Sequence, residues 1–123
     1  MNRIVIAGNV GKDPELKYSN AGMAILKFSV ADTSGKDDKK KTIWHSVTAF
    51  GDLAENAAEA LSKGTRVVIE GKLTEDKYTN KEGVEVTRYQ VLADDVMLSV
   101  KWGSPESLLP AKPAPAENDE EPF

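Results

Sequence analysis

The fold is decided by residues 42–73, which read TIWHSVTAFGDLAENAAEALSKGTRVVIEGKL. Thr42–Phe50 alternates between two kinds of side chain, as a strand with two different faces does. Thr65–Leu73 is rich in β-branched residues and is also typical of a strand. Between them, an apolar stripe at helical spacing consists of Leu53, Ala57, Ala60 and Leu61. The stretch therefore predicts a strand, a helix and a second strand.

Two signals predict where this helix begins and ends. Asp52 precedes the apolar stripe and is followed three residues later by Glu55, a variant of the capping box. Gly64 follows the stripe and favours the left-handed conformation that often terminates a helix. We therefore expect Asp52 to be the N-cap and Gly64 to occupy the C′ position.

Strand patterns flank this stretch on both sides. On the N-terminal side they are Arg3–Val10 and Met23–Ala31, and on the C-terminal side Val86–Val100. Polar hairpin tips are expected at Asp32–Lys41 and Tyr78–Gly83. The order of three strands, one helix and two strands predicts an all-β fold with one helix. A five-stranded OB-fold barrel has this order, and other small β-barrels also fit it.

The C-terminal part of the chain differs in composition from the rest. Five of the six prolines lie at or after Pro105, and the sequence up to Ala116 has no apolar periodicity. Such sequence cannot bury enough apolar surface to offset the entropy cost of ordering. We expect a folded domain over residues 1–102, followed by a disordered tail. The tail consists of a Pro/Ala-rich linker over 103–116 and an acidic tip over 117–123.

The net charge of −4 is carried entirely by this tail. The chain has 20 acidic and 16 basic residues, and residues 103–123 contain five acids and one base, which leaves 15 of each in residues 1–102. A neutral domain has no general attraction for phosphates. Nucleic-acid binding would therefore depend on local basic patches or on stacking.

Several function classes lack the residues they need. The chain has no cysteine and one histidine, His45, so zinc sites, thiolate chemistry and histidine-based triads lack parts. We expect no enzyme activity, no metal and no cofactor. No apolar run approaches the ~20 residues of a membrane span, and no signal sequence precedes the first strand. We therefore expect a cytoplasmic protein without membrane contact.

The strand Thr42–Phe50 has two contrasting faces. One is mostly apolar and consists of Ile43, His45, Val47 and Ala49, and the other consists of Thr42, Trp44, Ser46, Thr48 and Phe50. Two aromatic rings among small polar side chains suit a surface on which bases stack, because the small neighbours leave room for sugar and phosphate. The alternative is that Trp44 and Phe50 pack beneath a loop or in a subunit interface. We expect His45 to be a packed or interface residue.

A third aromatic residue and a set of basic residues extend this hypothesis. Tyr78 lies at the mouth of the second hairpin beside Lys77 and Lys81, as an aromatic side chain does in grooves that bind single strands. The basic side chains that could contact phosphates are Arg3, Lys12, Lys17, Lys27, Lys39, Lys40, Lys41, Lys63, Arg66, Lys72, Lys77 and Arg88. Since most surface lysines are simply solvated, we expect only part of this set to take part.

The last seven residues form a second informative segment. Acidic side chains there precede Pro122, Phe123 and a free α-carboxylate. A solubilising tail has no use for a terminal phenylalanine. An aromatic anchor among carboxylates instead suits a partner pocket that is apolar at its base and basic at its rim. We therefore expect partner binding by Asp119, Glu120, Glu121, Pro122 and Phe123.

Together these segments resemble the bacterial single-stranded DNA-binding protein family. The matching motifs are NVGKDPE at 9–15, WHSV at 44–47, FGDLAE at 50–55, KG at 63–64 and VIEGKL at 68–73, with the acidic Pro-Phe end. They span nearly the whole chain in the family's order. The resemblance implies an OB fold and a homotetramer associated with the nucleoid. It also implies sequence-tolerant binding of single-stranded DNA and contacts with replication, recombination and repair proteins.

The resemblance also implies roles for single residues. It assigns base stacking to Trp44, Phe50 and Tyr78. Phosphate contact is expected for Arg3, Lys63, Lys72 and Lys77, with Lys17 and Arg66 added from the basic set. The chain departs from the family pattern at Ser46, Asp52, Ser62 and Asp76, where relatives often have a base, and at Glu121, where an apolar residue is commoner.

Two other functions also fit the sequence. One is an OB module that binds structured RNA, and the other is an adaptor that works through its tail without nucleic acid. Titration with oligo-dT, matched RNA and duplex DNA separates the three.

Overall fold

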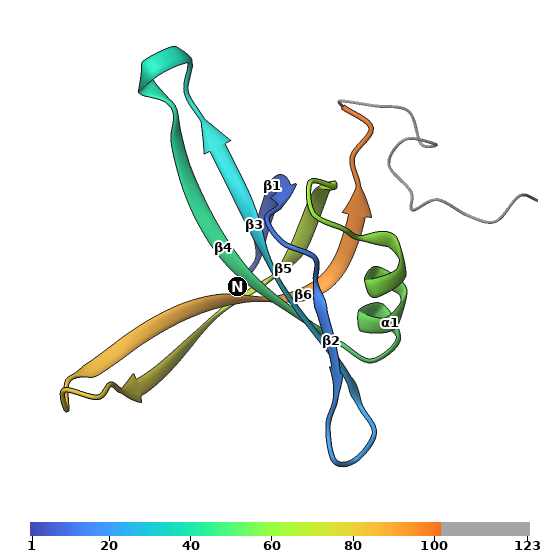
Figure 1. Cartoon of the computed structure of the whole chain (residues 1–123), viewed down its shortest axis with the longest axis vertical. Coiled ribbons are helices and arrows are strands. Elements are labelled where there is room, and N and C mark those ends of the chain that lie inside the picture. The colour runs from blue at the N-terminus through green and yellow to red at the C-terminus, as the bar shows by residue number, and fades with distance from the viewer. Residues whose placement is uncertain (102–123) are drawn as a thin grey trace, which may run out of the picture.

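The computed structural model describes residues 1–101, which contain six strands and one helix (Figure 1). The strands are β1 Ile4–Val10, β2 Glu15–Tyr18, β3 Ala24–Ser34, β4 Lys41–Phe50, β5 Arg66–Thr79 and β6 Glu85–Leu98. The helix α1 spans Gly51–Ala60, and a 3₁₀ turn at Asp37–Lys39 separates β3 from β4. Trp102, the expected linker and the acidic tip lie outside the described residues.

Five of the strands close into a ring. They pair in the order β1-β5-β6-β4-β3, and β3 returns to β1 through Asn9 and Ala31. Within residues 1–101 the pairings are antiparallel except that of β4 with β6, which is parallel at Val47 and Val91. In chain order, β4 and β5 are the third and fourth strands of the ring, and the helix connects them. The prediction of an all-β fold with one helix and a five-stranded OB-type barrel is confirmed.

The ring closes where β1 crosses from one neighbour to the other. Gly8 pairs with Val67 of β5, and the next residue, Asn9, also reaches Ala31 of β3. A Cβ atom on Gly8 would collide with the carbonyl oxygen of Ala31 and lie 2.8 Å from the side chain of Val30. The missing side chain of Gly8 therefore lets β1 and β3 approach closely enough to close the barrel.

The inside of the ring is filled by the apolar half of each strand's alternation. In β3 the side chains of Ala24, Leu26, Phe28 and Val30 point inward, and those of Lys27 and Ser29 point outward, as the alternation predicted. Helix α1 packs beside β3 and adds Ala54 and Ala57 to the core. The largest fully buried side chains are Leu26, Val30, Val47, Val67, Ile69 and Val91.

The strands differ from the sequence prediction in two respects. The segment Glu15–Tyr18 carries no strand prediction, yet it pairs with β3 as a short edge strand. Its side chains are all exposed, so the half-buried pattern that identifies a strand is missing. In addition, β3 continues to Ser34 and β5 to Thr79, because each pairs with its hairpin partner beyond the barrel, where no core imposes alternation.

Both predicted helix ends are wrong. The N-cap is Phe50, in extended conformation, and no side chain caps the helix, because β4 runs directly into α1 through Gly51 at φ +69°. Asp52 follows Gly51 and is the second residue of the helix, inside the first turn. At the other end the C-cap is Leu61, and Gly64 belongs to the following turn, where its N–H donates to the carbonyl of Val10 at 2.8 Å.

The edge strand β2 is joined to the helix by one side-chain hydrogen bond. The hydroxyl of Tyr18 donates to Oε2 of Glu55 at 2.9 Å. This bond, with desolvation and the negative charge of Glu55, raises the pKa of Tyr18 above its ordinary value of 10.0. Because the folded pKa is the higher one, the bond stabilises the fold at neutral pH. Its contribution is lost only as the pH rises through the folded pKa.

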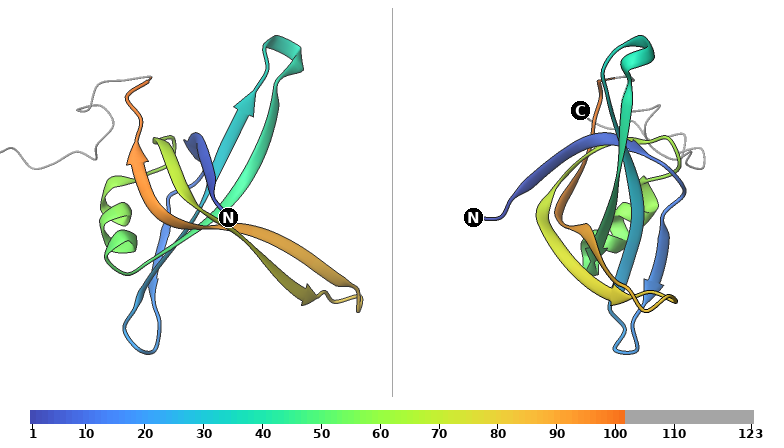
Figure 2. Two further views of the ribbon diagram at one scale, coloured as in Figure 1. Left: turned by 180° about the vertical axis from the view of Figure 1, so that it is seen from behind. Right: turned by 90° about the vertical axis from the view of Figure 1, so that its left-hand side faces the viewer.

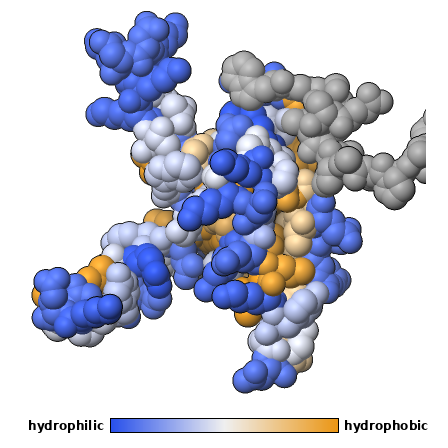
Figure 3. All heavy atoms as spheres, in the orientation of Figure 1, coloured by the Kyte–Doolittle hydropathy of each residue, from blue (hydrophilic) through white to orange (hydrophobic). Residues whose placement is uncertain are grey.

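Besides the shorter hairpin of β2 and β3, two long hairpins project from the barrel. One is formed by β3 and β4 up to their 3₁₀ turn, and the other by β5 and β6 up to the turn at residues 80–84 (Figure 1). Views from behind and from the side show that the two diverge as they leave the barrel (Figure 2). The β3–β4 end is hydrophilic, and apolar surface lies nearer the barrel (Figure 3). The barrel thus carries two arms with a space between them.

Barrel closure can be tested at Gly8. We expect Gly8→Ala to lower the free energy of unfolding in urea by about 1–3 kcal/mol, because the new methyl group must displace the backbone of Ala31. Gly22→Asn is the control, since a Cβ there meets no atom within 4 Å and asparagine tolerates its positive φ. Equal stability of Gly8→Ala and the unmodified chain would contradict this account of closure.

Candidate nucleic-acid interface

The outward-facing side chains of β4 lie in rows beside those of β3. Residues directly opposite each other in paired strands project to the same side of the sheet. Lys17 of β2 pairs with Ile25 of β3, which extends the row that contains Phe50. The five outward pairs of β4 with β3 are Thr42–Thr33, Trp44–Ala31, Ser46–Ser29, Thr48–Lys27 and Phe50–Ile25. The two predicted rings and the predicted Lys17 therefore share one face.

The same face continues onto β6 and β5. Thr48 pairs with Leu92 of β6, and Leu92 pairs with Lys72 of β5. The hydroxyl of Thr48 also donates to Oε1 of Gln90 at 3.1 Å, which joins the two hairpins at their bases. Tyr78 lies six positions beyond Lys72 on β5, an even number that keeps both side chains on one side. One continuous outer face thus carries all three predicted aromatic residues.

The three rings on this face are exposed to solvent. Trp44 is 61% exposed, Phe50 43% and Tyr78 44%. None of them is buried beneath a loop of residues 1–101, so that half of the alternative is wrong, and packing of Trp44 and Phe50 in a subunit interface stays a prediction. Large apolar rings gathered on one outer face are typical of an interaction surface rather than of a core.

Trp44 lies directly against the loop between β1 and β2. A Cβ atom on Gly11 would collide with Cζ3 of the Trp44 ring and lie 3.0 Å from the hydroxyl of Ser29. The N–H of Gly11 also donates to the carbonyl of Ser29 at 2.9 Å, which fixes this loop to β3. The backbone at Gly11 therefore supports one side of the indole ring.

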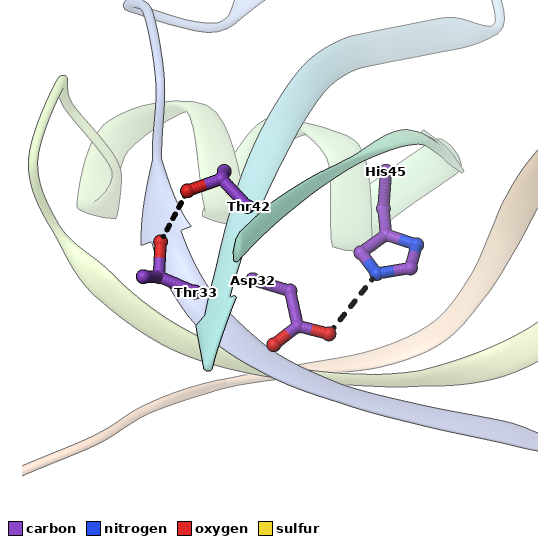
Figure 4. Close-up of polar contacts among 4 residues, drawn as sticks. All are labelled: Asp32, Thr33, Thr42 and His45. Carbon is purple, nitrogen blue, oxygen red and sulfur yellow. Dashed lines mark hydrogen bonds and ion pairs between the residues drawn. The ribbon is translucent and has the colours of Figure 1, made fainter. Parts of the chain in front are cut away.

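Contacts between β3 and β4 hold the part of the hairpin that carries Trp44 (Figure 4). On the face of Trp44, the hydroxyl oxygens of Thr33 and Thr42 are 2.9 Å apart. On the opposite face, Nε2 of His45 lies 3.4 Å from Oδ2 of Asp32. The imidazole is partly buried in the hairpin, as the prediction of a packed histidine requires. These contacts join β3 to β4 on both faces of the hairpin near Trp44.

A groove of about 430 Å³ lies between the two hairpins, against the barrel. Its lining comes from the β1–β2 region and from β3, β4, β5 and β6. The residues are Lys12, Asp13, Glu15, Lys27, Phe28, Ser29, Ser46, Val47, Thr48, Asp76, Arg88 and Gln90. Three of these side chains are basic and three are acidic. The groove is therefore close to electrically neutral, and its volume is within the range of ligand-binding clefts.

Comparisons with known proteins identify the family. Residues 1–99 match the model of a family described as the single-strand binding protein family. This chain belongs to that family. Curated relatives named single-stranded DNA-binding protein come from Xanthomonas campestris pv. campestris, at 42% identity over 103 residues, and from Neisseria meningitidis serogroup A, at 35% over 103 residues. The matches cover 80% of this chain but only 60% and 59% of those relatives.

Membership of the single-strand binding protein family confirms the resemblance drawn from the sequence motifs. A family described by binding rather than by catalysis agrees with the expectation that the chain is not an enzyme. Among residues 1–101, no group of three or more His, Cys, Asp and Glu side chains is placed to hold a metal ion. No helix in this described part is long and apolar enough to cross a membrane.

Six basic residues are predicted to contact phosphates, and three of them lie near the groove or on the face that carries the rings. Lys72 and Lys17 share the outer face with the three rings. Lys63 belongs to the loop after α1, and its backbone N–H donates to Oδ1 of Asp13, a groove residue, at 2.8 Å. Lys17 and Lys72 thus share the face of the rings, and the backbone of Lys63 lies beside the groove.

The other three predicted contacts lie elsewhere. The guanidinium of Arg3 forms an ion pair with Glu70. Lys77 lies on the side of its hairpin opposite Tyr78, and its Nζ is 4.0 Å from Oε1 of Glu75. Arg66 begins β5 and lies outside the groove, three strands from Trp44 in the row that runs through Asn9 and Ala31. The structure therefore does not bring all six predicted basic residues together.

Sequence reasoning missed residues that the structure places in the groove. Lys27 and Arg88 belonged to the wider basic set but were not selected, and Gln90 was not considered. The position of Lys27 could have been predicted, because the alternating sequence of β3 places its side chain on the outer face. The places of Arg88 and Gln90 depend on the register between β5 and β6 and on the parallel contact with β4. Neither can be read from a single strand.

Proposed function

We propose that this chain binds single-stranded DNA without strong sequence preference, along the outer face of β3, β4, β5 and β6. The observation that carries the proposal is the presence of three exposed rings, Trp44, Phe50 and Tyr78, on one continuous face beside the groove. Every base has a π-face, so stacking on such rings tolerates any sequence. Family membership supports the same function, which we expect to operate in the cytoplasm at the nucleoid.

Stacking should contribute more to this binding than phosphate contacts do. The domain is neutral, and the groove has as many acidic as basic side chains. Each stacked base contributes about 1–3 kcal/mol by alanine substitution. The number of phosphate contacts can be measured separately, because the slope of the logarithm of the binding constant K against the logarithm of the salt concentration changes by about 0.7 per contact with a single strand.

The stacking surface can be tested by removing two rings together. We expect Trp44→Ala/Phe50→Ala to weaken binding of fluorescein-labelled oligo-dT, measured by anisotropy, by about 1–3 kcal/mol per ring. Circular dichroism should show an unchanged fold, because both side chains lie outside the core. Tyr89→Ala is the control, since Tyr89 is exposed but faces the opposite side of the β5–β6 hairpin. If the folded double variant binds oligo-dT with unchanged affinity, the proposal is wrong.

The same titration separates the rival functions. Tighter binding of oligo-dT than of duplex DNA and of matched structured RNA is expected, because paired bases do not offer free faces to the three rings. Preference for structured RNA would favour the RNA-binding module. Absence of binding to any nucleic acid would leave only the adaptor.

An apolar patch on another part of the barrel wall supports assembly into a homotetramer. Val5 and Ala7 of β1 are exposed, and Ala7 continues through Val68 of β5 to Met97 of β6 in one row. Exposed apolar rows of this kind are typical of interfaces between subunits, which in homo-oligomers are usually symmetric. No residue of this row lines the groove, so assembly through the row could leave the groove open.

Light scattering at micromolar concentration should give about four times the chain mass. Val5→Asp/Met97→Asp should reduce this mass, because it places a charge in each contact between apolar rows. Binding of short oligo-dT to one barrel should be affected much less. A clean monomer for the unmodified chain would refute the tetramer.

We further propose that the acidic tip over residues 117–123 recruits replication, recombination and repair proteins, while the domain over 1–102 binds DNA and the linker over 103–116 connects them. The proposal rests on the sequence of the tip, in which acidic residues precede Pro122 and Phe123. Burial of a phenylalanine contributes about 1.5–3 kcal/mol. Binding by one tip should therefore be weak, and several tips on one tetramer should strengthen it by avidity.

Deletion of residues 117–123 should abolish pull-down of such proteins and should keep or slightly raise affinity for oligo-dT at low salt, since it removes four acids. Phe123→Ala should reproduce the loss of partners without the effect on DNA, because it leaves the charge unchanged. Loss of DNA affinity in the truncated chain, or continued capture of partners, would contradict this division of roles.

A further inference from the structure

Three side chains on the β5–β6 hairpin interact at the edge of the groove. Asp76 and Arg88 are direct cross-strand partners, and Oδ2 of Asp76 lies 3.6 Å from Nη2 of Arg88. The guanidinium carbon of Arg88 also lies 5.2 Å from the centre of the Tyr78 ring. Asp76 and Arg88 both line the groove. Arg88 is thus held by a carboxylate while it covers part of one of the three rings.

A bound DNA strand would compete with both contacts of Arg88, the one with the Tyr78 ring and the one with Asp76. A guanidinium over a ring occupies the kind of position in which a base would stack. The same guanidinium is suited to bind a phosphate through two parallel hydrogen bonds, which its contact with Asp76 discourages. The side chains of Arg88 and Asp76 are 58% and 53% exposed, so their ion pair is weak enough to be exchanged.

We propose that Asp76 limits the affinity of the groove for single-stranded DNA by keeping Arg88 on Tyr78 and away from phosphate. The proposal rests on the proposed function of this face. When a strand enters, a base takes the place of the guanidinium on Tyr78, and a phosphate takes the place of the carboxylate on Arg88. The exchange breaks the contact between Asp76 and Arg88, and the free energy of that contact is subtracted from the free energy of DNA binding. Asp76 is therefore an affinity-determining residue that acts through Arg88.

Asp76→Asn tests this inference, because it removes the charge and keeps the size of the side chain. In the full chain we expect oligo-dT affinity, measured by anisotropy at low salt, to increase roughly two- to fivefold. The slope of log K against log salt should become steeper by up to about 0.7, the value for one additional phosphate contact. Glu85→Gln is the matched control. It makes the same change in net charge on the same hairpin, but Glu85 lies on the side opposite Tyr78.

A double-mutant cycle shows whether Asp76 acts through Arg88. In an Arg88→Gln background, Asp76→Asn should have little further effect, because no guanidinium remains to be released. An undiminished gain in that background would mean that Asp76 only repels phosphates directly, and would overturn the inference. The inference is also overturned by an equal gain in Glu85→Gln, or by no gain in Asp76→Asn.

The outcome for the unmodified chain separates this inference from the function on which it rests. If the unmodified chain binds oligo-dT and Asp76→Asn binds it equally well, only the role of Asp76 is wrong. If the unmodified chain does not bind oligo-dT at all, the proposed function fails and the role of Asp76 fails with it.

Discussion

The pairing of β1 with both β5 and β3 is the contact on which the barrel depends. At Gly8 the strand leaves one neighbour for the other, and the backbones approach so closely that no side chain fits between them. A sheet closed in this way has no free edge along the ring, so its strands pair on both sides around a shared core. The arms that leave the barrel begin from these fixed positions.

Closure also decides what each strand presents to solvent. The inward half of the alternation is used by the core, so an outward side chain such as Phe50 is left on the outside, and Trp44 and Tyr78 lie further along the arms, where both faces of the hairpins are largely exposed. The short parallel contact of β4 with β6 then sets one hairpin beside the other and defines the groove between them. Within residues 1–101, two local supports hold Trp44 there: the backbone at Gly11 and the side-chain contacts on both faces of its hairpin.

The charges of this surface suit adjustable rather than strong attraction. Basic side chains near the groove have acidic neighbours, and Glu15 directly faces Lys27 just as Asp76 faces Arg88. An exposed ion pair such as Asp76–Arg88 stabilises a fold very little, but an acidic neighbour reduces the positive charge available to phosphates. Stacking on a ring such as Phe50 displaces no counter-charge, whereas Tyr78 is partly covered by the guanidinium of Arg88. A neutral barrel with exposed aromatics is therefore consistent with binding dominated by stacking.

The sequence by itself determined the element order, the inward face of β3 and the outward aromatics of β4, because all three follow from alternation within a strand. It could not reveal β2, whose residues are all exposed, nor the helix ends, where β4 runs into α1 without a side-chain cap. Only the tertiary structure decided which basic residues reach the groove. Placing Arg88 and Gln90 beside Tyr78 and Thr48 requires the register of three strands, and register depends on contacts between residues far apart in the chain.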